Sequence, residues 1–189
     1  MISIFRILII CIFLAFICCS TPSADPSIIE SYFKTHNNHL VKDALEYYHE
    51  EITFTLIGVW TKKGKKEIAT LETWDSTLHS SLKLKDYKIN GDTIFCTVVE
   101  KNDWFNRIGI DSLIHDPTIF IIKDNLIHEI IATPEESIGI KMNETMEIIF
   151  GWCMENKDTT INELIIGGQF VYSAVAAESW MDLFDKMKQ

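Results

Sequence analysis

The sequence lacks several features that would assign it to well-known classes of protein. Basic residues are not in excess: 17 Lys and Arg stand against 27 Asp and Glu, which gives a net charge of −10. Nucleic-acid phosphates require a basic surface, so this balance argues against nucleic acid as a partner. A glycine-rich phosphate loop, a nucleophile elbow and an internal repeat are also missing. We therefore expect no cofactor.

The sequence also lacks the fixed spacing of His, Cys, Asp and Glu residues that is typical of metal sites. The pairs His36/His39, His115-Asp116 and His128-Glu129 come nearest, but none has the fixed spacing of a zinc site, so we expect no metal.

Cysteines are few after residue 19. Only Cys96 and Cys153 remain there, and we interpret them as two buried thiols. A disulfide formed in an oxidising compartment is the alternative.

No apolar stretch reaches the roughly 20 residues that a membrane-spanning helix needs. The run from Ile7 to Cys19 follows Arg6 and has the length of a signal-peptide core. We interpret residues 1–18 as a signal peptide that is cleaved before Cys19, because the residues around this position resemble a bacterial lipobox. Cleavage before Cys18 is one alternative. A retained membrane anchor is another, although no positive stop-transfer cluster follows.

Processing before Cys19 predicts that this cysteine carries a lipid. Each methylene of the lipid buried in the membrane would add about 0.8 kcal/mol to the free energy of membrane binding. Ser20 after the cysteine matches the bacterial sorting pattern for the outer membrane. We therefore expect a protein of the cell envelope, either an outer-membrane lipoprotein or a periplasmic protein. Residues 19–24 would be a short tether.

The remaining residues predict one α+β domain of ordinary size. Apolar residues at helical spacing predict one helix that begins near Pro26 and two further helices that span residues 40–48 and 67–82. Alternating or continuous apolar runs predict strands at 51–57, 83–89, 93–101 and 118–133. Turns are expected at residues 61–66, at 90–92 and, within a hairpin, at 123–125. After Pro134 the pattern is helical again, with one apolar stripe formed by Met146, Ile149, Phe150, Cys153 and Met154. Ser173 is placed to cap a last helix.

This order of elements resembles the nuclear transport factor 2-like superfamily, in its SnoaL-like branch. The resemblance covers residues 25–134 and rests on the paired helices before Ile52, on Gly64, Lys66 and Ile68, and on the stretches 100–104 and 109–111. It implies a cone: a curved antiparallel sheet wrapped around helices, the cystatin-like or SnoaL-like fold, with a pocket at its wide end. Residues 135–189 would form a C-terminal helical extension that packs on this domain. The fold hosts enzymes, binders and assembly domains alike, so it does not define an activity.

The ketosteroid isomerases of this superfamily can be compared with the chain residue by residue. Their tyrosine on the first helix matches Tyr32. Their general-base aspartate falls at Thr55 and their protonated aspartate at Thr118. Threonine cannot abstract a proton near neutral pH, so the resemblance does not extend to that mechanism.

Four residues are candidates for acid–base chemistry: Asp75, His79, Glu100 and Asp103. Asp75 lies near the apolar stripe of the predicted helix 67–82, and His79 follows one turn later as its partner. This pair would be either an acid–base dyad facing the pocket or an ion pair at the rim of the core. Glu100 and Asp103 follow an apolar strand and would be either a second polar pair at the pocket mouth or an ordinary strand end.

Five further residues are candidates for ligand binding. Asn102 and Trp104 belong to the same polar and aromatic stretch, and Tyr32, Trp60 and Trp74 would line the same cavity. The alternative for each aromatic residue is packing in the core.

Three functions follow from these observations. The first is a binding module for a small apolar ligand or a partner. The second is a structural envelope subunit that forms a homodimer through the outer face of the sheet. The third is an enzyme of the dehydratase, isomerase or cyclase type.

Overall fold

The computed structural model describes residues 24–188. The predicted signal peptide, Cys19 and nearly all of the predicted tether lie outside these described residues. Within residues 24–188, no helix combines the length and the apolar composition that a membrane crossing requires.

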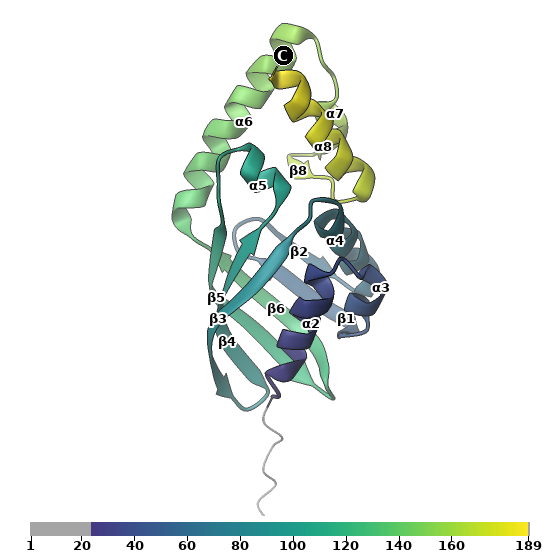
Figure 1. Ribbon diagram of the computed structural model, residues 1–189, viewed down its shortest axis with the longest axis vertical. Coiled ribbons are helices and arrows are strands. Elements are labelled where there is room, and N and C mark those ends of the chain that lie inside the picture. The colour runs from purple at the N-terminus through teal and green to yellow at the C-terminus, as the bar shows by residue number, and fades with distance from the viewer. Residues whose placement is uncertain (1–23, 189) are drawn as a thin grey trace, which may run out of the picture.

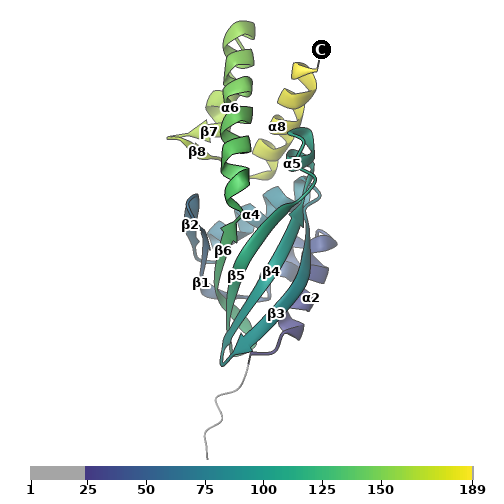
Figure 2. The same ribbon diagram turned by 90° about the vertical axis from the view of Figure 1, so that its left-hand side faces the viewer.

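The core of the fold is a curved sheet that wraps around helices (Figures 1 and 2). Within the described residues its six strands run in the order β2-β1-β6-β5-β4-β3. The strands are β1 (Tyr48–Leu56), β2 (Trp60–Lys63), β3 (Ser81–Asn90), β4 (Thr93–Lys101), β5 (Leu113–Lys123) and β6 (Leu126–Pro134). The helices that precede or interrupt them are α2 (Ser27–Asn37), α3 (Val41–Leu45), α4 (Lys65–Thr77) and α5 (Asp103–Arg107).

The predicted α+β cone is confirmed, but its sheet is mixed rather than wholly antiparallel. Tight turns join β1 to β2, β3 to β4 and β5 to β6, and each of these pairs is antiparallel. Strands β1 and β6 are parallel neighbours. Four strands and the helices α4 and α5 separate them along the chain, which leaves room for the crossover that a parallel pair needs.

Two predicted boundaries were wrong. Residues 61–66 were expected to form a turn, but Trp60–Lys63 form the edge strand β2 because the chain turns earlier, at Gly58. The helix expected at 67–82 ends at Thr77. His79 takes a left-handed backbone conformation, with φ of 51°, and Leu82 already belongs to β3.

The hydrophobic core has two parts. The first lies between the concave face of the sheet and helix α2, where Ile29, Ile52 and Ile127 are fully buried. The second joins α4 and α5 to the C-terminal segment, around Trp104 and Trp180. Cys96 and Cys153 are buried free thiols in different parts, as expected.

The C-terminal segment stands over the wide end of the cone (Figure 1). It consists of α6 (Glu136–Asn156), α7 (Ile161–Leu164), the short hairpin β7 (Ile165–Ile166) and β8 (Gln169–Phe170), and α8 (Ala174–Met187). Ser173 caps α8 as predicted, since its Oγ accepts a hydrogen bond of 3.1 Å from the amide of Ala176. The stripe expected on α6 is only half right: Ile149 and Cys153 are buried, whereas Phe150 and Met154 are exposed.

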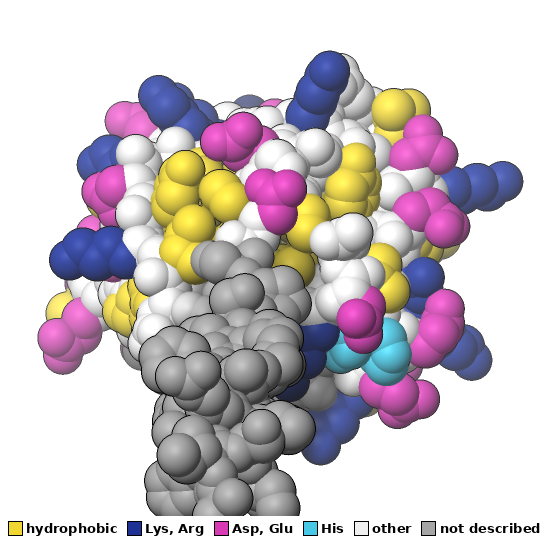
Figure 3. Space-filling model, turned by 90° about the horizontal axis from the view of Figure 1, so that it is seen from below, with side chains coloured by type: hydrophobic (Ala, Val, Ile, Leu, Met, Phe, Trp, Pro, Cys, Tyr) yellow, Lys and Arg dark blue, Asp and Glu magenta, His cyan; other side chains and the backbone are white. Residues whose placement is uncertain are grey.

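At the opposite end of the molecule, where the described part of the chain begins, acidic, basic and apolar side chains are intermixed on the surface (Figure 3). No large basic field is visible on this face.

Trp180 should be the residue on which the second core depends most. It is fully buried on α8, and its ring centroid lies 5.6 Å from that of Trp104 and 5.2 Å from that of Phe170. We predict that Trp180→Ala lowers the free energy of unfolding by about 3–5 kcal/mol, because a large cavity is left behind. Chemical denaturation measures this, with Val175→Ala, an exposed site on the same helix, as a control expected to change it by less than about 0.5 kcal/mol. Equal effects of the two substitutions would contradict the prediction.

Candidate functional site

A cavity of about 420 Å³ lies inside the wide end of the cone. The concave face of the sheet, helix α4 and strand β2 form its walls, and α6 and the segment around Tyr172 close it from above. Most of the lining is aliphatic or aromatic. All five predicted ligand-binding residues line it: Tyr32, Trp60, Trp74, Asn102 and Trp104.

Of the four predicted acid–base residues, the structure brings two together. Asp75 from α4 and Glu100 from β4 both line the cavity. The expected pairing of Asp75 with His79 is wrong, because the left-handed backbone at His79 turns its side chain away from the helix. His79 instead bonds Asp103 at the surface, with 2.7 Å between Nδ1 and Oδ2, and neither residue lines the cavity.

Three side chains place hydrogen-bond donors near the carboxylate group of Glu100. Asn102 Nδ2 donates to Oε1 at 2.9 Å, His115 Nε2 donates to Oε2 at 3.0 Å, and the Ser80 hydroxyl lies 3.5 Å from Oε1. Burial alone would raise the pKa of Glu100, but its hydrogen bond and electrostatic interaction with His115, with smaller effects of His36 and Asn102, lower this pKa. Glu100 is therefore an ionised carboxylate.

Asp75 has the opposite environment. Its carboxyl group accepts no hydrogen bond from residues 24–188, and the small part of the side chain that remains accessible faces the cavity. Burial and the neighbouring charge of Glu100 raise the pKa of Asp75 well above its ordinary value, against a smaller opposing effect of His36. One cavity thus holds two carboxyl groups whose environments move their pKa values in opposite directions, the arrangement expected of an acid and a base.

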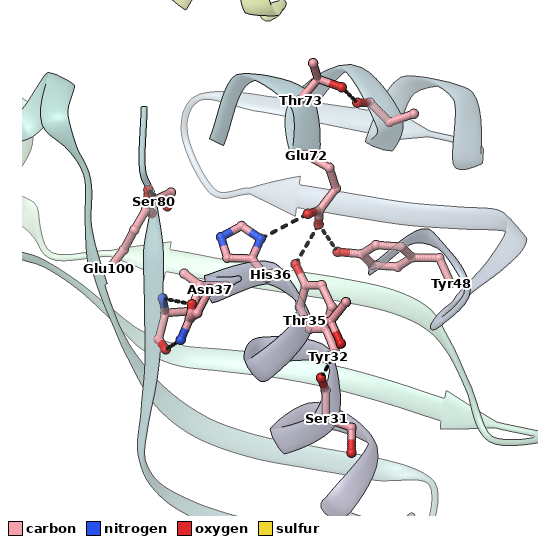
Figure 4. Close-up of polar contacts among 12 residues, drawn as sticks. Ser31, Tyr32, Thr35, His36, Asn37, Tyr48, Glu72, Thr73, Ser80 and Glu100 are labelled. Atoms are coloured by element: carbon pink, nitrogen blue, oxygen red, sulfur yellow. Dashed lines mark hydrogen bonds and ion pairs between the residues drawn. The ribbon is translucent and has the colours of Figure 1, made fainter. Parts of the chain in front are cut away.

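A third carboxylate, Glu72, anchors the base of the site (Figure 4). The hydroxyls of Tyr32 and Tyr48 each donate to its Oε1 at 2.8 Å, and His36 Nδ1 donates to its Oε2 at 3.0 Å. Burial would lower the pKa of His36, but the hydrogen bond and charge of Glu72 outweigh it and raise this pKa to about 8. Glu72 and His36 therefore form a buried ion pair at neutral pH.

Sequence reasoning missed four residues of the site: Glu72, His36, His115 and Tyr172. Glu72 lies on α4 three residues before Asp75 and points to the same side. Helical spacing from Asp75 could therefore have predicted that Glu72 belongs to the site. No local sequence pattern indicates that Tyr172 belongs to the site. Its hydroxyl accepts a hydrogen bond of 2.9 Å from Trp60 Nε1, which is 112 positions away in the chain. Among the described residues, no three His, Cys, Asp or Glu side chains are grouped as metal ligands.

Comparison with solved structures identifies the fold. The chain is similar to the epoxide hydrolase/cyclase-like enzyme SalBIII (12% identity, 59% of this chain and 90% of that chain covered, TM-score 0.52). It is also similar to a nuclear transport factor 2-like protein of unknown function from Cytophaga hutchinsonii (7%, 64% and 98%, 0.51). A protein of unknown function with a cystatin-like fold from Methylobium petroleophilum matches as well (16%, 61% and 80%, 0.50).

No protein-family model and no curated protein matches the sequence. The solved structures share too little sequence with the chain to carry more than the architecture. That architecture is the nuclear transport factor 2-like, cystatin-like cone, as the sequence predicted.

The Glu72–His36 pair predicts a pH dependence of stability. The folded protein holds His36 with a pKa of about 8, above the ordinary 6.5, so the pair stabilises the fold fully below pH 6.5 and loses this contribution as the pH rises through 8. We predict that the free energy of unfolding falls by about 2 kcal/mol across this window.

Denaturant titrations at pH 6 and pH 9 measure this difference. His36→Gln removes the titrating group while leaving the other groups near it, Glu72, Asp75 and Glu100, in place. The variant should be less stable at pH 6 and should lack this part of the pH dependence. The same slope in both proteins would show that His36 is not its source.

Proposed function

We propose that this protein binds a small, largely apolar organic molecule inside the cone, with Asp75 and Glu100 contacting the polar end of that molecule. The observation that carries the proposal is the partly open cavity of about 420 Å³ that presents these two carboxyl groups within an apolar wall. Cavities of this size and lining are typical of small-molecule sites, where a few polar groups fix the orientation of the ligand.

The energetic cost of the cavity supports the same proposal. An unfilled apolar space loses packing energy, and a carboxyl group in an apolar wall without a hydrogen-bond partner costs further free energy. The fold keeps both although aliphatic side chains would fill the space more stably. Sites that sacrifice stability in this way are typical of binding and catalysis.

A cavity-filling substitution tests the proposal. Gly139 on α6 lines the cavity, has ordinary backbone angles, and a Cβ added there meets no atom within 4 Å. Gly139→Phe should therefore fill the mouth without straining the fold. We predict that the wild type binds the uncharged fluorescent probe N-phenyl-1-naphthylamine and that Gly139→Phe weakens this binding at least about tenfold.

Gly151→Phe is the matched control. Gly151 lies on the same helix with equally open space around it, but it does not line the cavity. Probe binding should be unchanged in this variant. Binding that survives Gly139→Phe, or is absent from the wild type, would contradict the proposal.

Catalysis is the second candidate function, and the opposed pKa shifts of Asp75 and Glu100 favour it. A neutral Asp75 could donate a proton while an ionised Glu100 accepts one, directly or through water. SalBIII, which shares the fold, is described as an epoxide hydrolase/cyclase-like enzyme in pyran ring formation. An acid–base reaction on a cyclic or cyclising small molecule is the corresponding activity for this site.

The structural-subunit alternative rests on the outer face of the sheet. Phe95, Ile119 and Ile131 lie side by side there on three neighbouring strands, and Phe95 is exposed. The helices that pack on the sheet lie on its other face (Figure 2). A homodimer through this face would cover the row and is compatible with ligand binding inside the cone.

Export and lipid anchoring complete the proposal for the whole chain. We predict that the full-length chain, expressed in a Gram-negative host, sediments with the membranes and that the mature protein begins at an acylated Cys19. Cys19→Ser should release the protein into the soluble fraction, whereas Cys18→Ser should not. Mass spectrometry of the mature N-terminus measures the outcome, and retention of Cys19→Ser at the membrane would refute Cys19 as the anchor.

A further inference from the structure

Among the Asp, Glu, Lys and Arg side chains of residues 24–188, only acidic ones line the cavity. Four carboxyl groups line it, those of Glu72, Asp75, Glu100 and Glu135, and no lysine or arginine of the described residues does. A cavity built for an anionic ligand would show the opposite balance. The lining therefore disfavours carboxylate, phosphate and sulfate groups in the deeper part of the site.

The four carboxyl groups differ in how they are compensated. Glu72 accepts hydrogen bonds from His36 and two tyrosines, and Glu100 accepts them from His115 and Asn102. Glu135 is exposed at the mouth, where water surrounds it. Asp75 alone lies inside the cavity without a hydrogen bond from any described residue, so only water or a ligand in the cavity can supply one.

The aromatic wall beside Asp75 suits a positive charge. The ring centroids of Trp74 and Tyr172 lie 5.3 Å apart, and Trp60 lies next to Tyr172 at 6.0 Å. Lys62 already places its Nζ 4.8 Å from the centre of the Tyr172 ring and 5.7 Å from that of Trp60. Indole and phenol rings attract cations through the negative potential of their faces.

We propose that the molecule bound in the cone is an organic cation, a protonated amine on an apolar body, whose ammonium group pairs with Asp75 beside Trp74 and Tyr172. This inference rests on the proposed binding function and names the chemical class of its ligand. An ammonium group supplies the hydrogen-bond donors that Asp75 lacks, and its positive charge favours the ionised form of this carboxyl group beside Glu100. The apolar body of the ligand fills the space between the sheet and α6.

Three probes with one carbon skeleton separate the contribution of charge from that of apolar burial. They are 3-phenylpropylamine, 3-phenylpropan-1-ol and 3-phenylpropanoate, each used to displace N-phenyl-1-naphthylamine from the wild-type protein at pH 7. We expect the amine to displace the dye at least about tenfold more effectively than the alcohol, and the carboxylate to be the weakest of the three.

Asp75→Asn shows whether the preference arises at this carboxyl group. The substitution keeps the shape of the side chain and should bring the amine to within about threefold of the alcohol while leaving the alcohol itself little changed. Asp103→Asn is the matched control: it removes the same charge from the chain at a residue outside the cavity, and the amine preference should persist. Thermal melts confirm that both variants are folded.

The outcomes distinguish the two proposals. If the dye binds but the wild type does not prefer the amine over the alcohol, the ligand class is wrong and the binding function stands. If the preference survives Asp75→Asn, the cation does not pair with Asp75 and the inference fails. If the dye itself does not bind, the proposed function fails and the ligand class fails with it.

Discussion

The closure of the cone by the aromatic cluster around Trp104 and Trp180 is the interaction on which the rest of this structure depends. The side chains on the concave face of the sheet leave a hollow at the wide end of the cone. Here α8 packs against α4 and α5, and Tyr172 reaches Trp60 on the edge strand β2. This contact between distant parts of the chain forms part of the cavity wall, because both residues line the cavity.

Enclosure also determines the chemistry of the carboxyl groups. In an open groove, water would solvate Asp75 and Glu100 alike, and their pKa values would stay close together. Inside the cone, each group responds to its own neighbours: Glu100 to His115 and Asn102, Asp75 to burial and to Glu100. The Glu72–His36 pair binds α4 to α2 and so helps to fix the helix that carries Asp75 (Figure 4).

Much of the fold could be predicted from the sequence because its signals are local. The turn at residues 90–92, the strand at 93–101 and the cap at Ser173 depend on neighbouring residues and were found at the correct positions. The error at His79 is different in kind. A single left-handed residue ended the helix early, and the periodic pattern that paired Asp75 with His79 could not reveal it.

The sequence by itself determined the α+β class, the acidic charge, and five aromatic and polar residues that line the cavity, because residue type and spacing are enough to place each on an element. Only the tertiary structure decided which carboxyl groups share that cavity. Asp75 and Glu100 lie on a helix and a strand whose relative position depends on sheet curvature and on the C-terminal segment. Such contacts join residues far apart in the chain, and no local pattern encodes them.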